Sequence, residues 1–463
     1  MARRASAAAA LAVAVAVLTL APASAGAARP LTLGFADSVA FGPPAERDLW
    51  FARTRAAGGR FTIVALNWAS IAPRPLTNAQ LANPGHDDAP WRTVDEAVRA
   101  ATARGLTVVL ALDKAPAWAE GPDRPDGAQP GVWRPDPAAF AAFALGAARR
   151  YSGAYGGLPA VRYWQIWTEP NLGTHLLPQY EGRGAAGPEI YRALLNGAYD
   201  AIKSVRRVNV VMTAGTAPFG GNLPGLPRIR PVAFYRALLC LRGRRLALAR
   251  CPRPARFDAL SHHPYSTGAP TRPALNADDV SIADLHKLTR VLRRAERTRR
   301  VFPRRRKAVW ATEVSYDSRP PDPRGVPERL HARWLAQSLY LLWRDGASRI
   351  AWFQVRDEPS GGSFNTTYQS GIYLVDGRPK LALAAFRFPV AGQRVSRRLV
   401  RIWGRAPAAG RLALQRRAGS RWVTFRTLRV AALGTFLVTV PSRGRIEVRA
   451  RVAGVTSLAW SQS

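Results

Sequence analysis

Two patterns in the sequence predict an α/β protein, built as a (β/α)8 TIM barrel followed by a small all-β sandwich domain. Eight short apolar runs alternate with helical patterns from residue 31 to about residue 355, and helical periodicity stops near residue 390. Strands that alternate with helices of this length are typical of a parallel sheet, and eight such units close a barrel. An open doubly wound sheet is the rival architecture, but no glycine-rich dinucleotide-binding turn follows the first apolar run.

The predicted strands are short and mostly end on polar or aromatic residues. They cover 31–36, 61–66, 106–112, 161–168, 208–214, 257–261, 308–312 and 349–353. In a barrel of parallel strands, all the carboxyl ends lie on one face, where active sites are built. Long stretches rich in proline and glycine follow several of these strands, so we expect them to form the loops of that face.

Helical patterns fill the gaps between the strands. Asp136 followed by Pro137 is typical of an N-cap and a first-turn proline, which predicts a helix that runs to Arg150. Apolar residues recur at helical spacing between Ile190 and Val205. The expected helices cover 93–104, 137–150, 188–206, 231–241, 281–297 and 327–343.

After residue 390, short runs of mixed polarity are separated by Gly, Ser and Pro turns. They cover 399–403, 411–415, 422–428, 435–440 and 446–452. This pattern predicts a small antiparallel β-sandwich. We therefore expect a signal peptide over 1–28, a catalytic barrel over 29–390 and a β-sandwich over 391–463.

The first residues predict an export signal. Arg3 and Arg4 precede an apolar run over 7–20, and Ala23-Ser24-Ala25 offers a small-residue cleavage site. We therefore expect a secreted protein, extracellular or associated with the cell envelope. Because disulfides persist outside the cytosol, Cys240 and Cys251, which lie close together in the sequence, are expected to form a local disulfide.

The charge balance is strongly basic, with 68 Lys and Arg against 30 Asp and Glu, a net charge of +38. One interpretation is attraction to a polyanion, either nucleic acid or an acidic envelope polymer. The other is a composition effect on solvated surfaces, which the spread of arginines along the whole chain favours. No aromatic residues interleave with the densest basic runs, so we expect no nucleic-acid partner. Electrostatic association with an anionic cell envelope stays open, and we expect a monomer.

Metal and cofactor chemistry has no support in the sequence. The six histidines show no metal-ligand spacing, either among themselves or with the cysteines. No Gly-x-Ser-x-Gly elbow and no phosphate-binding glycine loop occur. We therefore expect no metal and no cofactor.

Most of the functional signal lies in the string Trp-Thr-Glu-Pro-Asn over 167–171. It places Glu169 at the end of the fourth predicted strand, and Glu313 follows the seventh. Glycoside hydrolysis needs such a pair: one acid protonates the leaving oxygen, and in a retaining enzyme the other carboxylate attacks the anomeric carbon. Carboxyl groups about 5–5.5 Å apart leave no room for an intervening water and so imply retention.

This string, together with Glu313 at the seventh strand, resembles the clan A glycoside hydrolases over about residues 31–390, and families 5 and 39 most. The resemblance implies that Glu169 is the acid/base, that Glu313 is the nucleophile and that the substrate is a β-linked oligo- or polysaccharide. Thr168 departs from the clan, which usually has an asparagine there that binds the sugar 2-hydroxyl. A non-catalytic carbohydrate- or envelope-binding protein on a degenerate barrel is therefore the alternative hypothesis.

The resemblance also implies substrate-binding roles after the sixth and eighth strands. His262, His263 and Tyr265 resemble the clan's aromatic or histidine partner near the nucleophile. Trp352 resembles the tryptophan that stacks beneath the sugar ring.

Other strand ends and one loop offer further substrate-binding candidates. Asp37 follows the first strand, and Asn67 and Trp68 follow the second. Trp118, in the long third loop, would either stack on a sugar or pin that loop. We also expect Glu169 to be protonated at rest, because the charge of Glu313 and partial burial would raise its pKa.

Overall fold

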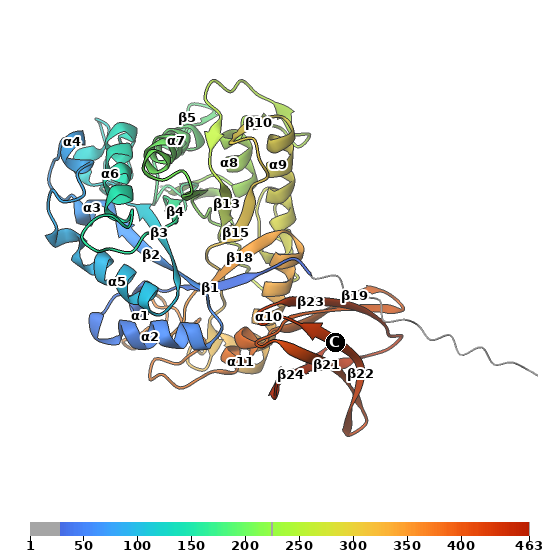
Figure 1. The fold of residues 1–463 in the computed structure, drawn as a ribbon. Helices are drawn as coiled ribbons and strands as arrows, with labels where there is room; N and C mark the ends of the chain where they lie inside the picture. Colours follow the sequence, from blue (N-terminus) through green and yellow to red (C-terminus); the bar gives the residue numbers. More distant parts are fainter. Residues whose placement is uncertain (1–27, 224–225, 463) are drawn as a thin grey trace, which may run out of the picture.

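The computed structural model describes residues 28–223 and 226–462 (Figure 1). The predicted signal peptide therefore lies, apart from Ala28, outside the described residues. Eight parallel strands close a barrel in the order β1-β18-β15-β13-β7-β4-β3-β2. These strands are β1 (Thr32–Ala36), β2 (Phe61–Asn67), β3 (Thr107–Asp113), β4 (Tyr163–Ile166), β7 (Val210–Thr213), β13 (Ala259–His262), β15 (Ala308–Ala311) and β18 (Ala347–Trp352). The predicted eight-stranded barrel is confirmed, and each strand overlaps its predicted range.

Helices surround the barrel strands (Figure 1). They are α2 (Pro44–Ala56), α5 (Arg92–Ala103), α6 (Pro137–Arg150), α7 (Gly187–Val205), α8 (Pro231–Leu238), α9 (Leu285–Arg297), α10 (Glu328–Arg344) and α11 (Leu381–Arg387). Helix α6 begins as predicted, because the Asp136 side chain accepts hydrogen bonds from the Ala138 and Ala139 amides. Helix α2 was not expected, because its buried face includes Arg47 and Thr54 and so breaks the apolar periodicity.

The interior of the barrel is filled by alternate side chains of the strands, because successive residues of a strand point to opposite faces. Phe61, Tyr163 and Trp310 pack together there: the centroid of the Trp310 ring lies 5.9 Å from that of Phe61 and 5.5 Å from that of Tyr163. The Arg349 guanidinium lies 4.6 Å from the Tyr163 ring and 4.7 Å from the Trp310 ring. The barrel interior is therefore a packed core, and in barrels of this kind active sites lie at the carboxyl-end mouth.

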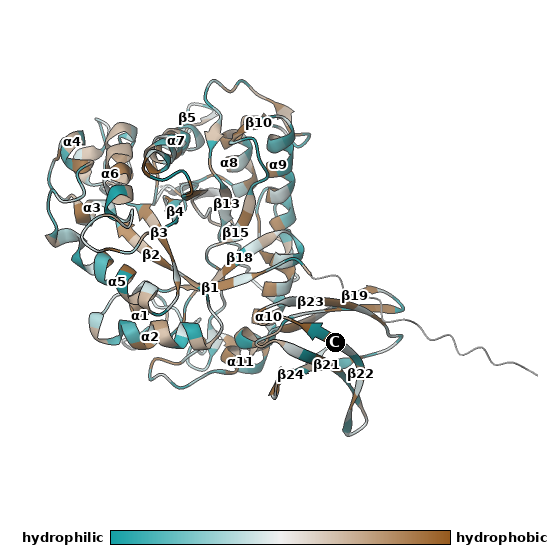
Figure 2. Ribbon diagram, viewed as in Figure 1, coloured by the Kyte–Doolittle hydropathy of each residue, from teal (hydrophilic) through white to brown (hydrophobic). Residues whose placement is uncertain are grey.

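Side chains of the other parity point outward and form the main core between strands and helices. Leu33, Phe35, Trp164 and Trp352 belong to this layer and are fully buried. Figure 2 shows the hydrophobic residues gathered on the barrel strands, while the helices carry hydrophilic residues as well.

Two antiparallel sheets follow the barrel. One contains β19 (Val390–Ser396), β20 (Leu399–Arg405) and β23 (Thr435–Pro441). The other contains β22 (Arg421–Val430), β21 (Gly410–Ala418), β24 (Glu447–Val452) and β25 (Val455–Thr456), with β26 (Trp460–Ser461) paired to β24. Apolar side chains of both sheets, including Ile402, Leu414 and Val448, share one core. The predicted all-β region is therefore confirmed.

The β-sheets lie beside α10 (Figure 1), and an aromatic contact joins them to this helix. The ring of Trp403 in β20 lies 5.8 Å from Tyr340 and 5.8 Å from Trp343 of α10. Arg405 is buried beside it and donates to the Gly58 carbonyl oxygen at 3.1 Å. These contacts join the two parts into one packed unit.

The predicted disulfide is present. Cys240 and Cys251 are bonded, with their Cα atoms 5.5 Å apart, and they close the segment between α8 and β13. That segment leads into the amino end of β13, at the end of the barrel opposite the mouth. Over the residues that the structure describes, no helix is long and apolar enough to cross a membrane.

Candidate active site

Glu169 and Glu313 project from loops that begin where β4 and β15 end. The Glu169 amide donates to the Gly215 carbonyl oxygen at 3.0 Å, which ties the loop after β4 to the loop after β7. Asn171, fully buried, strengthens this connection through hydrogen bonds to the backbone of Ala217 and Ile229. The Glu169 and Glu313 side chains are 19% and 27% exposed, so solvent reaches both carboxylates.

His263 lies between the two glutamates. Its Nδ1 is 2.9 Å from Oε1 of Glu169 and 3.6 Å from Oε2 of Glu313. These two carboxylate oxygens are therefore at most about 6.5 Å apart, the sum of the two distances. One imidazole nitrogen thus faces both carboxylates at once.

Gly215 provides the space that the His263 ring occupies. A Cβ atom built on Gly215 would lie 1.9 Å from Nε2 of His263, far inside van der Waals contact. Nε2 itself is buried and has no hydrogen-bond partner in the described structure. The ring is therefore held by its Nδ1 contacts to the glutamates and by packing over Gly215.

Tyr265 completes the surroundings of Glu313. Its hydroxyl donates a hydrogen bond to Oε2 of Glu313 at 3.2 Å. Glu313 Oε2 therefore faces two hydrogen-bonding side chains, and this contact fixes the direction of the carboxylate.

The pKa values in this cluster differ from the expected pattern. Burial by itself would raise the pKa of Glu169, but the hydrogen bond and charge of His263 outweigh it and hold that pKa below its usual value. Burial raises the pKa of Glu313, and the charge of Glu169 adds to the rise. Burial opposes the charged form of His263, yet the charges of Glu313 and Glu169 raise its pKa. The expectation of a protonated Glu169 at rest is therefore wrong, because the contact with His263 favours the ionised carboxylate of Glu169.

Thr168 and Asp113 form a second polar pair at the mouth. The Thr168 side chain hydrogen-bonds the Asp113 carboxyl group at the end of β3. Burial raises the pKa of Asp113 to about 6, and the charge of Glu313 contributes to the rise. Asp113 shares the inward parity of Val109, which lies in the barrel interior, so it faces the same space as the glutamates.

Several solved structures share this fold. The structure matches a family 39 glycoside hydrolase from the gut symbiont Bacteroides cellulosilyticus WH2 with a TM-score of 0.57 and 16% identity, over 89% of this chain and 81% of that chain. It matches GH5_18 from Streptomyces cattleya in complex with GlcNAc with a TM-score of 0.50 and 15% identity, over 78% of this chain and 79% of that chain. A glucosidase from Croceicoccus marinus matches with a TM-score of 0.50 and 12% identity, over 90% of this chain and 97% of that chain. No protein-family model and no curated protein matches the sequence.

The chain has the fold of these glycoside hydrolase structures, a closed barrel of eight parallel strands.

Within this glycoside hydrolase fold, the expected role of Trp352 is wrong. Trp352 is fully buried on the outer side of β18, where its ring lies 5.9 Å from His331 of α10 and its indole N–H donates to the Ser370 carbonyl oxygen. The next residue, Phe353, points inward instead and packs against the barrel interior. Its ring lies 5.2 Å from that of Tyr368, which is 50% exposed.

Phe353 and Tyr368 are site residues that the sequence analysis missed. Burial, and then the charges of Glu313 and nearby carboxylates, Glu169 among them, raise the pKa of Tyr368. Counting the parity of β18 from Arg349, which lies inside the barrel, would have identified Phe353 as the inward residue. No sequence pattern indicated Tyr368, because it lies in an irregular loop.

His262 and Asp37 are structural residues, so their expected sugar contacts are wrong. His262 is fully buried, with Nδ1 2.8 Å from the Thr216 hydroxyl and Nε2 2.9 Å from the Val280 carbonyl oxygen. Burial lowers the pKa of His262 to about 3, so the ring is neutral. Asp37 accepts hydrogen bonds from the Ala40 and Val355 amides, and burial raises its pKa to about 6.

The aromatic candidates near β2 also pack internally. Trp68 is fully buried, with its ring 5.7 Å from that of Phe143, so its expected sugar contact is wrong. Trp118 lies edge-on to Trp68 and donates to the Ala72 carbonyl oxygen at 2.8 Å, so it pins the third loop. Asn67 is half-buried at the mouth in register with Asp113, and its side chain accepts from the Ser70 amide.

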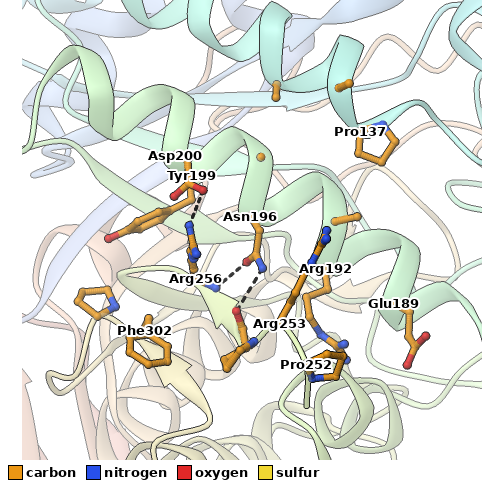
Figure 3. A pocket seen from close by; sticks show the side chains of 16 residues that line it. Pro137, Glu189, Arg192, Asn196, Tyr199, Asp200, Pro252, Arg253, Arg256 and Phe302 are labelled. Atoms are coloured by element: carbon orange, nitrogen blue, oxygen red, sulfur yellow. Dashed lines mark hydrogen bonds and ion pairs between the residues drawn. The ribbon is translucent and has the colours of Figure 1, made fainter. Parts of the chain in front are cut away.

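A groove of about 1130 Å³ lies elsewhere, along the outer side of α7 (Figure 3). Asn196 there holds the backbone of Pro254 and Arg256, and Arg256 pairs with Asp200. None of the predicted site residues lines this groove. The barrel mouth, with its paired carboxylates, is therefore the candidate active site.

Proposed function

We propose that the protein is a retaining hydrolase of β-linked glycosides, with Glu169 as the acid/base and Glu313 as the nucleophile. The observation that carries this proposal is the position of His263, whose Nδ1 lies 2.9 Å from Glu169 and 3.6 Å from Glu313. Carboxyl groups about 5–5.5 Å apart belong to retaining enzymes, whereas inverting pairs lie about 6.5–9.5 Å apart. The upper limit of about 6.5 Å between the nearer oxygens supports the retaining arrangement.

In the first step, the Glu313 carboxylate attacks the anomeric carbon while the glycosidic C–O bond breaks and Glu169 gives a proton to the leaving oxygen. In the second step, Glu169 removes a proton from water, and that water displaces Glu313 from the sugar. The Tyr265 hydroxyl holds Glu313 in position for the attack. Glu169, Glu313 and His263 interact strongly, so their apparent pKa values belong to the three residues together rather than to any one of them. The first step requires the form in which Glu169 carries a proton and Glu313 is ionised.

The surroundings of the pair support a carbohydrate substrate. The exposed ring of Tyr368 offers a stacking surface, and Phe353 lies beneath it. Thr168 and Asp113 offer a hydroxyl and a carboxylate to sugar hydroxyl groups. The similar solved structures include a glucosidase and a protein in complex with Manb1-4GlcNAc, which favours β-linked glucosides and mannosides as first substrates. We also propose that the protein acts outside the cell, as a monomer.

The proposal is tested with a panel of aryl β-glycosides and β-linked polysaccharides. Proton NMR of the first product is expected to show the β-anomer, which then equilibrates with the α-anomer. Glu313→Gln and Glu169→Gln are expected to lower kcat/KM at least a thousandfold. Glu189→Gln, which removes an exposed carboxylate on α7, is the matched control and is expected to leave kcat/KM unchanged. An α-anomeric first product, or full activity of Glu313→Gln, would refute the mechanism.

The second candidate function is carbohydrate binding without turnover. The observation behind it is Thr168, whose side chain is engaged with Asp113. Measurable oligosaccharide binding at the mouth, with no hydrolysis over the whole panel, would favour this candidate over the hydrolase.

A further inference from the structure

The region after the barrel is far more basic than the rest of the chain. Residues 391–463 contain fifteen arginines, no lysine and a single acidic residue, Glu447. The whole chain has 68 basic and 30 acidic residues, a ratio of about two to one. The arginines are therefore not evenly spread, and a composition effect common to the whole surface does not account for this region.

Five of these arginines share the outer face of the five-stranded sheet. On β21, β22 and β24, the side chains of one parity, such as Leu412, Leu414, Val448 and Ala450, enter the sandwich core. Residues of the other parity point away from it. This outer face, which we call the arginine face, carries Arg411, Arg417, Arg429, Arg449 and Arg451 in successive rows of the sheet, with Trp422 opposite Arg417.

The strand register places these charges in neighbouring rows of one face. Arg411 of β21 pairs directly with Arg429 of β22, and Arg451 of β24 pairs with Ala413 in the next row. Like charges opposite each other destabilise a sheet pair. Across the described residues, no carboxylate forms an ion pair with any of the five arginines. The face therefore keeps an uncompensated positive charge that an anionic partner would neutralise.

Trp422 organises two of the guanidinium groups. Arg449 lies 4.4 Å from the Trp422 ring centroid, and Arg417 lies 5.5 Å from it. Arg449 also donates to Gln415 at 2.8 Å, and Gln415 in turn donates to Thr424 at 3.3 Å. Stacking and hydrogen bonding hold a guanidinium in one orientation, so its remaining donors are ready for bidentate contact with a carboxylate.

We propose that the arginine face binds an anionic polysaccharide that carries carboxylate groups, such as a polymer of uronic acids. The choice of a polysaccharide rests on the proposed glycosidase function. The choice of an anion rests on the charge of the face alone. Single-stranded nucleic acids bind by stacking their bases on aromatic rings. Arg449 and Arg417 already stack on Trp422, which therefore presents guanidinium groups rather than a bare ring.

The full chain is tested for binding to polygalacturonate by isothermal titration calorimetry at two salt concentrations. Arg417→Gln/Arg449→Gln/Arg451→Gln is expected to raise Kd at least tenfold. The control Arg244→Gln/Arg245→Gln/Arg290→Gln removes the same charge from exposed positions of the barrel region and is expected to change Kd less than twofold. The charge-conserving Arg417→Lys/Arg449→Lys/Arg451→Lys is expected to give an intermediate loss, because lysine lacks the bidentate fork. Unfolding midpoints of all variants verify that they are folded.

Three outcomes would overturn the proposal. Equal losses in the two glutamine variants would show that net charge alone drives binding. Equal binding of fully methyl-esterified polygalacturonate would exclude recognition of carboxylates. Tighter binding to DNA of equal charge concentration would favour a nucleic acid. Binding is also measured with Glu313→Gln, which is expected to bind the polymer like the unaltered protein, so failure of the glycosidase proposal and failure of this proposal are distinguishable.

Discussion

Nδ1 of His263 lies 2.9 Å from Oε1 of Glu169, close enough for a charge-assisted hydrogen bond between the end of β13 and the loop after β4. This contact changes the electrostatics of the whole mouth. It favours the ionised form of Glu169, whereas Glu313, which Nδ1 faces at 3.6 Å, remains harder to ionise than an ordinary glutamate. The proton balance of the pair therefore depends on a residue that carries neither of the two proposed catalytic roles.

His263→Asn is expected to shift the alkaline limb of the kcat/KM profile to higher pH. Removing the His263 imidazole removes the hydrogen bond and charge that lower the pKa of Glu169, so the acid stays protonated to a higher pH. Activity at the optimum is expected to fall about ten- to a hundredfold, because the pair loses its shared contact. The profile is measured with an aryl β-glycoside, with His286→Asn, at an exposed histidine, as the control. An unmoved alkaline limb would contradict this electrostatic role.

Tyr265→Phe is expected to lower kcat/KM about tenfold and to move the acidic limb to higher pH. The Tyr265 hydroxyl lowers the pKa of Glu313, so its removal raises that pKa and a smaller fraction of the nucleophile is ionised at low pH. A hydrogen bond to a charged group contributes about 1.5–3 kcal/mol, enough for a change of this size. Tyr180→Phe, an exposed tyrosine in β5 (Tyr180–Glu181), is the control. Wild-type pH dependence in Tyr265→Phe would count against the contact.

Gly215→Ala is expected to abolish activity although residue 215 need not touch substrate. The added Cβ would lie 1.9 Å from Nε2 of His263 and must displace the ring from the glutamates. Overpacking of this kind costs about 1–3 kcal/mol of unfolding free energy. Denaturant unfolding and kcat/KM are measured together. Gly444→Ala, where an added Cβ meets nothing within 4 Å, is expected to change neither quantity.

Thr168→Val is expected to raise the pKa of Asp113 above about 6, because the Thr168 hydrogen bond lowers it. Thr168→Ser keeps the hydroxyl and is the matched control. The pH dependence of KM is measured for both variants, and only the valine variant is expected to move an inflection near pH 6 upward. If the serine variant moved it equally, the methyl group rather than the hydroxyl of Thr168 would be the relevant feature.

Trp403→Ala is expected to destabilise the protein by about 3–5 kcal/mol, because it removes a fully buried indole from the contact with Tyr340 and Trp343. The kcat/KM value is expected to remain unchanged, since this contact lies on the outer side of α10. Thermal unfolding midpoints supply the comparison, with Trp422→Ala, a half-buried tryptophan on the sheet surface, as the control. Equal midpoints for the two variants would mean that the aromatic contact contributes little.

The sequence determined the elements and brought out the two carboxylates to which we assign the proposed catalytic roles. Strand and helix periodicity predicted the eight barrel strands, because apolar spacing is a local property that the barrel preserves. The string around Glu169 and the strand-end position of Glu313 predicted that the two carboxylates meet, because parallel strands end on one face. The disulfide between Cys240 and Cys251 followed from their proximity in the chain.

Only the tertiary structure decided which neighbours of these residues face the site. His262 and His263 are adjacent in the sequence, yet they face different surroundings. The His262 ring contacts the Val280 carbonyl oxygen, whereas the His263 ring faces both glutamates. Trp352 and Phe353 differ in the same way, because successive strand residues point to opposite faces of the sheet. Trp352 packs in the core between strands and helices, whereas Phe353 faces the barrel interior. The tertiary structure also decides the ionisation of Glu169, because the pKa of this carboxyl group is lowered by the imidazole of His263, which lies 94 positions away in the chain.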